Sequence, residues 1–341
     1  MLKVLKTNIK THAILAIWPL LLAVIVTIVW GESKFKDYAI AANTGYFAGS
    51  LLDWGGTNFR ILFNKRNQIL SFWILKVSFL ALIAFILSFF LDFTSELAFM
   101  VAIFSNPLWV YVDIGEQATY NKFLLYSRIV CLALLFTPGF ITLVPIAFIL
   151  FNIILTYKLK KYFEYESFKY ITENSIFYIK HGLSFFLSKI STSAWMYLPL
   201  LILSTKTDSA LLPYLDKLYQ MAVTATVPFV LTQLKLGNFL SRKIMIVTGL
   251  TLIIFNLFPI IFSNYGSEEI ILFYAALSFL LIYLSVFGQG WVLPEKTIWI
   301  NCVYFFTTLI TLFVWQYYNS NIYALVGLFF VINFLIRIRV S

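Results

Sequence analysis

Long apolar runs dominate the sequence, and short polar stretches with charges or turn residues separate them. A helix needs about 20 apolar residues to cross the hydrocarbon core of a bilayer. It also satisfies its own backbone hydrogen bonds there, so the runs predict transmembrane helices. Twelve spans are predicted, at 12–30, 38–59, 69–91, 95–112, 119–137, 139–157, 176–203, 210–234, 244–263, 268–288, 297–315 and 322–338. We interpret the first run as a retained span, since no small-residue cleavage site follows it.

Lysine and arginine residues alternate between the two ends of these runs. With the N-terminus placed in the cytoplasm, 18 of them fall in segments predicted to be cytoplasmic and three in outer segments. Cytoplasmic segments of membrane proteins carry such an excess of positive charge. The distribution therefore predicts an even number of spans, with both termini in the cytoplasm.

The longest connection between runs divides the chain into two nearly equal halves. It covers 158–175 and is predicted to be a cytoplasmic loop. Six spans are predicted on each side of it, within 1–157 and 176–341. Many transporters are built from two such repeats and hold their substrate between them. We therefore expect an all-α polytopic membrane protein made of two six-helix bundles.

The composition excludes an ordinary soluble protein. Of the 341 residues, 61% are hydrophobic and only 12% are charged, and the mean hydropathy is +0.88. Soluble domains contain about 25% charged residues. Twelve spans leave no room for a soluble catalytic domain, so we predict a protein that is not an enzyme. The net charge of +10 is accounted for by the cytoplasmic segments, and we expect no nucleic-acid partner.

Candidate chemistry comes from ionisable side chains inside the predicted spans. Such a group costs about 2.5–3.5 kcal/mol at the centre of a membrane helix on insertion scales, so it is a candidate for function. Lys76 can extend to the cytoplasmic surface and is set aside. The remaining cations are Arg128, Lys189 and Lys217, and the acids are Asp53 and Asp216. The cysteines lie in apolar runs without neighbouring ligands, and we expect neither a metal nor a cofactor.

The three cations favour an anionic substrate. Arginine presents a planar fork and lysine a point charge to phosphate oxygens, and both bind more strongly where water is scarce. A water-filled cavity that contained all three would suit a diphosphate, with the two acids partly balancing its charge. The alternative interpretation is that these charges pair with one another and hold the helices together.

Several short stretches resemble a known family of membrane transporters. The run 37–55 resembles the second span of the Wzx-type polysaccharide flippases, and 106–109 with 115–117 resembles their Pro-x-Trp and Gly-x-Glu element. The stretches 182–189 and 215–220 are also similar to that family. These flippases belong to the multidrug/oligosaccharidyl-lipid/polysaccharide exporter superfamily.

The resemblance implies a flippase in the cytoplasmic (inner) membrane. Its substrate would be an undecaprenyl-diphosphate-linked oligosaccharide, such as an O-antigen or capsule repeat unit, moved by ion-coupled alternating access. Arg128, Lys189 and Lys217 would contact the substrate. Asp53 and Asp216 would couple transport to H⁺ or Na⁺, or form gating pairs. The implied partners are membrane lipids, a polysaccharide polymerase and chain-length proteins.

Two other functions remain as alternatives. A drug or lipid exporter of the same superfamily is the nearer one, because a fold does not determine its substrate. A membrane glycosyltransferase or polymerase is disfavoured, because it needs a large outer loop and every predicted outer loop here is short.

Overall fold

The structure is a computed structural model and consists of helices. It describes residues 17–51, 73–79, 94–159, 168–206, 209–225, 294–317 and 322–340, with short pieces between 250 and 281. Within these ranges no strand occurs, which confirms the predicted all-α class. Three described helices are long and apolar enough to span a membrane: Phe140–Leu159, Phe185–Ser204 and Ile298–Tyr317. The helices Ile17–Trp30 and Ser95–Phe104 are apolar but shorter.

The chain forms two compact units. The N-terminal unit is Val24–Lys189, and the C-terminal unit is Ile190–Ser341 together with Met1–Ala23. The N-terminal unit contains α2 (Glu32–Leu51), α5 (Ser95–Phe104), α6 (Leu108–Asp113), α7 (Gln117–Leu134) and α8 (Phe140–Leu159). The C-terminal unit contains α10 (Leu212–Thr224), α14 (Pro294–Tyr317) and α15 (Ile322–Val340).

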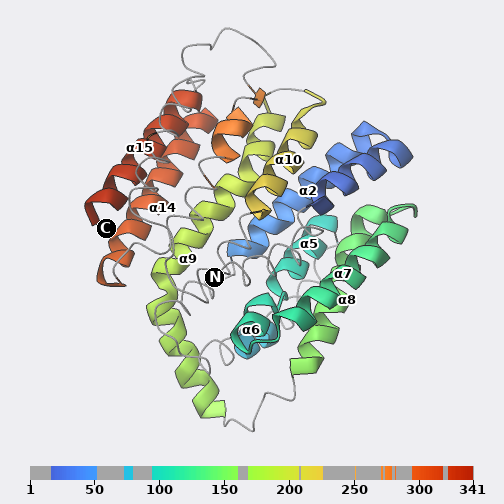
Figure 1. Ribbon diagram of the computed structural model, residues 1–341, viewed down its shortest axis with the longest axis horizontal. Coiled ribbons are helices and arrows are strands. Elements are labelled where there is room, and N and C mark those ends of the chain that lie inside the picture. The colour runs from blue at the N-terminus through green and yellow to red at the C-terminus, as the bar shows by residue number, and fades with distance from the viewer. Residues whose placement is uncertain are drawn as a thin grey trace. The chain divides into compact units, whose positions relative to one another are not determined.

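The helix α9 (Phe168–Ser204) begins in the N-terminal unit and ends in the C-terminal unit (Figure 1). It starts inside the segment 158–175 that the sequence predicts as a loop. With 37 residues it is also longer than the predicted span 176–203. The two six-helix bundles stay a prediction.

The helices α7 and α8 form an antiparallel hairpin in the N-terminal unit. The turn between them falls where the sequence predicts it, and Gly139 has a φ of 81°, which a residue without a side chain adopts at low cost. Across the hairpin, the Arg128 guanidinium carbon lies 4.5 Å from the ring centre of Phe148. Lys158 Nζ lies 4.0 Å from the ring centre of Phe123. Residue numbers rise on one helix as they fall on the other, so the helices run in opposite directions.

The helices α2 and α5 pack closely because two glycines face the contact. A Cβ atom at Gly45 would meet the carbonyl oxygen of Glu96 and Cβ of Phe99, and one at Gly49 would lie 2.8 Å from the carbonyl oxygen of Met100. Small residues four positions apart let two helix backbones approach in this way. Residue numbers rise together along the contact, so α2 and α5 run in the same direction.

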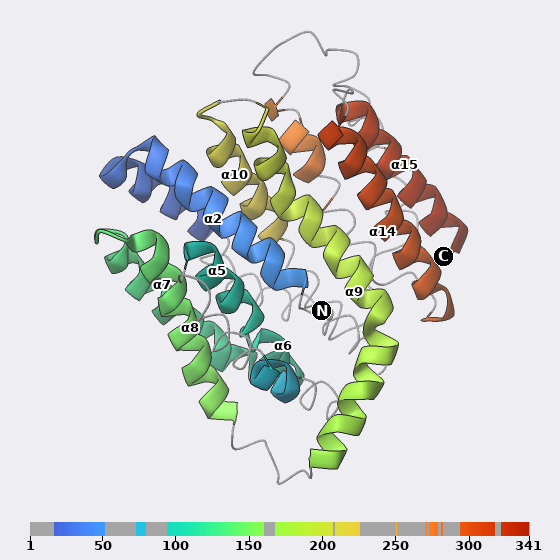
Figure 2. The same ribbon diagram turned by 180° about the vertical axis from the view of Figure 1, so that it is seen from behind.

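In the C-terminal unit, α9 and α14 lie side by side and run in the same direction (Figures 1 and 2). Trp195 Nε1 donates a hydrogen bond of 3.2 Å to Thr308 Oγ1. Just beyond the end of α9, Lys206 Nζ donates one of 2.6 Å to the carbonyl oxygen of Trp315, near the end of α14. The C-terminal ends of the two helices therefore lie at the same end of the unit.

Candidate functional site

The predicted span 95–112 is not one helix in the structure. Helix α5 ends at Phe104, α6 begins at Leu108, and Ser105, Asn106 and Pro107 lie between them. Proline has no N–H to donate and disfavours helical geometry in the residue before it, which explains why the helix is interrupted here. The hydropathy of the run does not reveal this interruption, because the residues on both sides of it are apolar.

Two asparagines bond to two of the backbone groups that this interruption frees. Asn106 Oδ1 accepts hydrogen bonds from the Leu108 N–H at 2.9 Å and from Tyr120 Oη at 3.0 Å. From α8, Asn152 Nδ2 donates to the carbonyl oxygen of Ala102 at 2.8 Å and to Ser105 Oγ at 3.1 Å. At membrane depth, irregular backbone is tolerated where it is buried in protein or lines a cavity.

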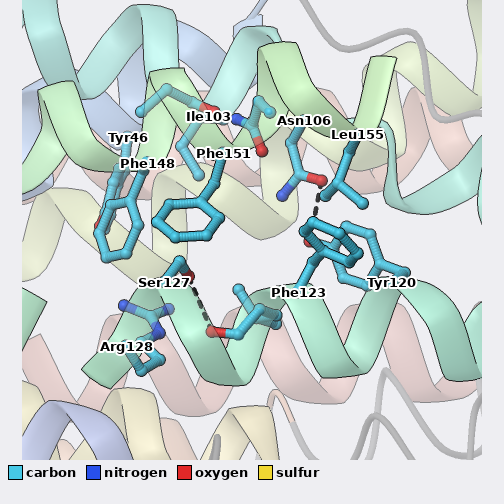
Figure 3. Close-up of a pocket in the computed structure, with 13 residues that line it drawn as sticks. Tyr46, Ile103, Asn106, Tyr120, Phe123, Ser127, Arg128, Phe148, Phe151 and Leu155 are labelled. Carbon is cyan, nitrogen blue, oxygen red and sulfur yellow. Dashed lines mark hydrogen bonds between the residues drawn. The ribbon is translucent and has the colours of Figure 1, made fainter. Parts of the chain in front are cut away.

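A cavity of about 70 Å³ lies beside the interruption, enclosed by α2, α5, α7 and α8 (Figure 3). Its polar lining consists of Tyr46, Asn106, Tyr120, Ser127, Arg128 and Asn152, and the remaining lining residues are apolar. In Figure 3, Ser127 and Arg128 lie on one side, and Phe148 and Phe151 lie on the other. Since one water molecule occupies about 30 Å³ in the liquid, the space suits a few waters or one small polar group.

The lining of this cavity carries a positive charge. Arg128 is its ionised side chain, and none of the lining residues is acidic. Its guanidinium lies against the face of Phe148, an arrangement that attracts a cation to the ring and holds the group in place. With amide and hydroxyl groups around it, the cavity has the chemistry of a site for one phosphate-like group.

Two more charged residues of the predicted site form a cluster on α10, together with a neutral one. Lys217 Nζ donates hydrogen bonds of 3.1 Å to Asp216 Oδ2 and to Gln220 Oε1, and Gln220 Nε2 donates one of 2.9 Å to the same Asp216 oxygen. The exposed fractions of these three residues are 0%, 3% and 5% for Asp216, Lys217 and Gln220. Their charges compensate each other, as a buried ion pair requires. In this conformation Lys217 is bonded to Asp216, as the pairing interpretation expects.

The α10 cluster is attached to α9 through the neighbouring Tyr219. Tyr219 Oη donates a hydrogen bond of 2.7 Å to the carbonyl oxygen of Trp195, and the ring of Tyr219 lies 5.7 Å from that of Tyr274. Trp195 is in turn bonded to Thr308 on α14. A displacement of α10 would therefore disturb these hydrogen bonds to α9 and between α9 and α14.

The remaining predicted residues are placed separately. Lys189 is half-buried on α9, at the end of the N-terminal unit. Arg128 lies in the N-terminal unit, and Asp216 and Lys217 lie in the C-terminal unit. Asp53 lies outside the described residues. The structure thus brings Asp216 and Lys217 together, and a single cavity shared by all five residues stays a prediction.

No protein-family model matches the chain, and no curated protein matches it. The resemblance to the Wzx-type flippases consequently depends on the short stretches quoted above. Function has to be argued from the residues themselves. Within the described ranges, no group of three or more His, Cys, Asp and Glu side chains is placed as metal ligands would be.

Sequence reasoning missed the polar residues that shape both sites. Asn106, Asn152 and Gln220 are neutral, and only ionisable residues were considered as candidates. The signal was present, because a side-chain amide inside an apolar run also needs a partner in a membrane. A search for Asn and Gln within the predicted spans would have found them.

Proposed function

We propose that the protein is a flippase of the cytoplasmic membrane. It carries an undecaprenyl-diphosphate-linked oligosaccharide from the inner to the outer leaflet by ion-coupled alternating access. The proposal includes twelve spans in two bundles, with both termini in the cytoplasm. The observation that carries it is the positively charged cavity of Arg128 inside an apolar helical unit.

That cavity is what a transporter of an anionic lipid needs. It contains an arginine, neutral hydrogen-bonding groups and no carboxylate in its lining. It also lies at an interrupted helix, a feature that transporters use to build substrate sites near the middle of the membrane. We therefore assign Arg128 to the phosphate groups of the substrate.

The directions of the helices support the proposed topology. In a chain of alternating spans, even-numbered spans run in one direction and odd-numbered spans in the other. Helices α2 and α5, from the second and fourth predicted spans, are parallel. Helices α9 and α14, from the seventh and eleventh, are parallel as well. Consecutive helices α7 and α8 are antiparallel.

The α10 cluster supports the coupling part of the proposal. Asp216 holds Lys217 in a buried, charge-neutral arrangement. A phosphate group that binds Lys217, or a coupling ion that binds Asp216, would leave the other residue of the pair without its balancing charge. Because Tyr219 is bonded to α9, such a change would reach the helix that carries Lys189.

The test is transport by the purified protein in liposomes. A fluorescent undecaprenyl-diphosphate disaccharide is incorporated, and its accessibility to a membrane-impermeant quencher is followed. We expect the wild type to equilibrate the lipid between leaflets and Arg128→Gln to slow transfer at least about tenfold, because a hydrogen bond to a charged group contributes about 1.5–3 kcal/mol. Lys122→Gln is the matched control, since Lys122 is exposed on the same helix.

The same liposomes distinguish the exporter alternative. Export of a cationic dye without transfer of the lipid would assign the protein to drug export. Equal transfer by Arg128→Gln and Lys122→Gln would refute the assignment of Arg128.

A further inference from the structure

An open apolar groove lies between α9 and α14 in the C-terminal unit. Its volume is about 690 Å³. It is lined by Leu198 and Ile202 from α9 and by residues of α14 between Phe306 and Gln316, and all of these side chains except Gln316 are apolar. Phe306 and Ile310 are 59% and 62% exposed. The groove does not belong to the cavity of Arg128 or to the α10 cluster.

The length of the groove matches one leaflet of a bilayer. At 1.5 Å per residue, the ten steps from Phe306 to Gln316 correspond to about 15 Å. The hydrocarbon core of a bilayer is about 30 Å thick, so one leaflet contributes about half of that. The acyl chain of a phospholipid extends over this distance, whereas an undecaprenyl chain is much longer.

A cation lies at one end of the groove. Leu198 and Ile202 are four residues apart and share a face of α9, and Lys206 follows in the turn after the end of that helix at Ser204. Lys206 is exposed, and its Nζ donates a hydrogen bond of 2.6 Å to the carbonyl oxygen of Trp315, next to Gln316 at the end of the groove. A lysine ammonium has three N–H donors, so this bond occupies one of them.

We propose that the groove binds one anionic membrane phospholipid, with an acyl chain between α9 and α14 and the phosphate group on Lys206. The charge at the groove's end selects an anionic headgroup over a zwitterionic one. The one-leaflet length selects an acyl chain over the undecaprenyl chain of the proposed substrate. The inference goes beyond the proposed transport and does not depend on it.

The first test uses the wild-type protein alone. Purified protein in detergent is titrated with phosphatidylglycerol and phosphatidylcholine of identical acyl chains and with undecaprenyl phosphate, and bound lipid is counted by native mass spectrometry. A cation near the membrane surface contributes about 1 kcal/mol to the binding of an anionic lipid, so we expect about fivefold tighter binding of phosphatidylglycerol. Equal binding of the two lipids would overturn the proposal. So would tighter binding of undecaprenyl phosphate than of phosphatidylglycerol.

The second test separates the headgroup contact from the groove. Lys206→Gln is expected to remove the preference for phosphatidylglycerol over phosphatidylcholine. Lys169→Gln is the control and should keep that preference, because Lys169 is 85% exposed and lies on α9 away from the groove. Ile310→Trp is expected to weaken the binding of both phospholipids about tenfold, because the larger side chain fills the groove. Leu328→Trp is its control, because Leu328 is 59% exposed on α15 outside the groove.

Each variant result has a defined meaning. A preference that survives Lys206→Gln would exclude Lys206 as the headgroup contact. Equal effects of Ile310→Trp and Leu328→Trp would exclude the groove as the site. If a variant elutes as an aggregate in size-exclusion chromatography, the three-lipid comparison on the wild type decides the proposal. If the wild type binds phospholipid as expected but does not transfer the lipid-linked oligosaccharide, only the flippase proposal is contradicted.

Discussion

Asp216 and Lys217 depend on each other, because both are buried and they are joined at 3.1 Å. We expect Asp216→Ala to reduce the free energy of unfolding by about 3–5 kcal/mol, since it leaves the lysine ammonium buried without the carboxylate that balances its charge. The double variant Asp216→Ala with Lys217→Met is expected to recover most of that loss. Unfolding in mixed detergent micelles, followed by tryptophan fluorescence, measures the wild type, the double variant and the two single variants Asp216→Ala and Lys217→Met.

An exposed ion pair on α9 provides the control for this prediction. Lys169 Nζ and the Glu173 carboxylate are 4.0 Å apart, and their side chains are 85% and 65% exposed. Glu173→Ala should change the free energy of unfolding by less than about 1 kcal/mol. If the losses of Asp216→Ala and Lys217→Met simply add in the double variant, the α10 cluster is not an energetic unit.

At this scale the sequence shows which charged residues lie inside apolar runs, but not how they are paired. Asp216 and Lys217 are adjacent in sequence, so their contact could have been expected from spacing alone. The part played by Gln220 depends on the helical repeat of α10, which brings its amide back to Asp216. The position of Arg128 in a cavity depends on residues of four helices, which hydropathy does not describe.

The close packing of α2 on α5 leads to a prediction at the scale of elements. Gly45→Ala should destabilise the protein by about 1–3 kcal/mol, because the added methyl group meets backbone of α5 that has no room to move aside. The direction of the stability change distinguishes the two effects. Without a steric clash, alanine would stabilise the helix relative to glycine by about 1 kcal/mol. The midpoint of thermal unfolding in detergent measures the effect.

Thr44→Ala is the control for Gly45→Ala. Thr44 is half-buried and precedes the glycine on the same helix. The prediction is that only the glycine variant unfolds at a lower temperature. Stabilisation by Gly45→Ala would mean that α2 and α5 are further apart than the structure has them.

The elements themselves could be predicted to different degrees. The turn between α7 and α8 was expected from Pro138 and Gly139, because both residues have strong local preferences. The interruption between α5 and α6 was missed although Pro107 signals it, since the surrounding run is apolar enough to span a membrane. Hydropathy reports which residues avoid water; it does not report where a backbone leaves helical geometry.

At the scale of the whole molecule, α9 provides a direct test of the proposed topology. Its 37 residues correspond to about 55 Å, which exceeds the roughly 40–45 Å of a bilayer with its headgroups, so both ends reach water. Charge alternation places Lys169 in the cytoplasm and Lys206 outside. In a protein with Cys131→Ser and Cys302→Ser, an impermeant maleimide applied to intact cells should label Lys206→Cys and not Lys169→Cys.

Permeabilised cells are the control for this labelling. Both introduced cysteines should then react, because both native lysines are exposed. Labelling of both positions from outside, or of Lys169→Cys alone, would contradict the orientation. It would also remove the argument that assigns the excess of positive charge to the cytoplasm.

Lys189 tests the transport proposal itself, because its position on α9 suits a role in the substrate path. It is the twenty-second residue of a 37-residue helix and half-buried, so it lies close to the middle of α9. We expect Lys189→Ala to insert in the membrane at the level of the wild type but to lose outward transfer of the lipid-linked oligosaccharide by at least about tenfold, since removing a lysine deletes a charged contact worth about 1.5–3 kcal/mol.

Two further variants separate a charge contact from a packing role at Lys189. Lys189→Arg keeps the cation and should retain part of the transfer, and Lys180→Ala, at an exposed lysine of the same helix, should leave it unchanged. Insertion and thermal unfolding of each variant are measured beside the transfer rate. A packing role predicts that Lys189→Ala and Lys189→Arg both lower the unfolding midpoint, whereas a substrate contact predicts a change in rate alone. Wild-type transfer by Lys189→Ala would exclude Lys189 from the path and leave Arg128 as the cation proposed to contact phosphate.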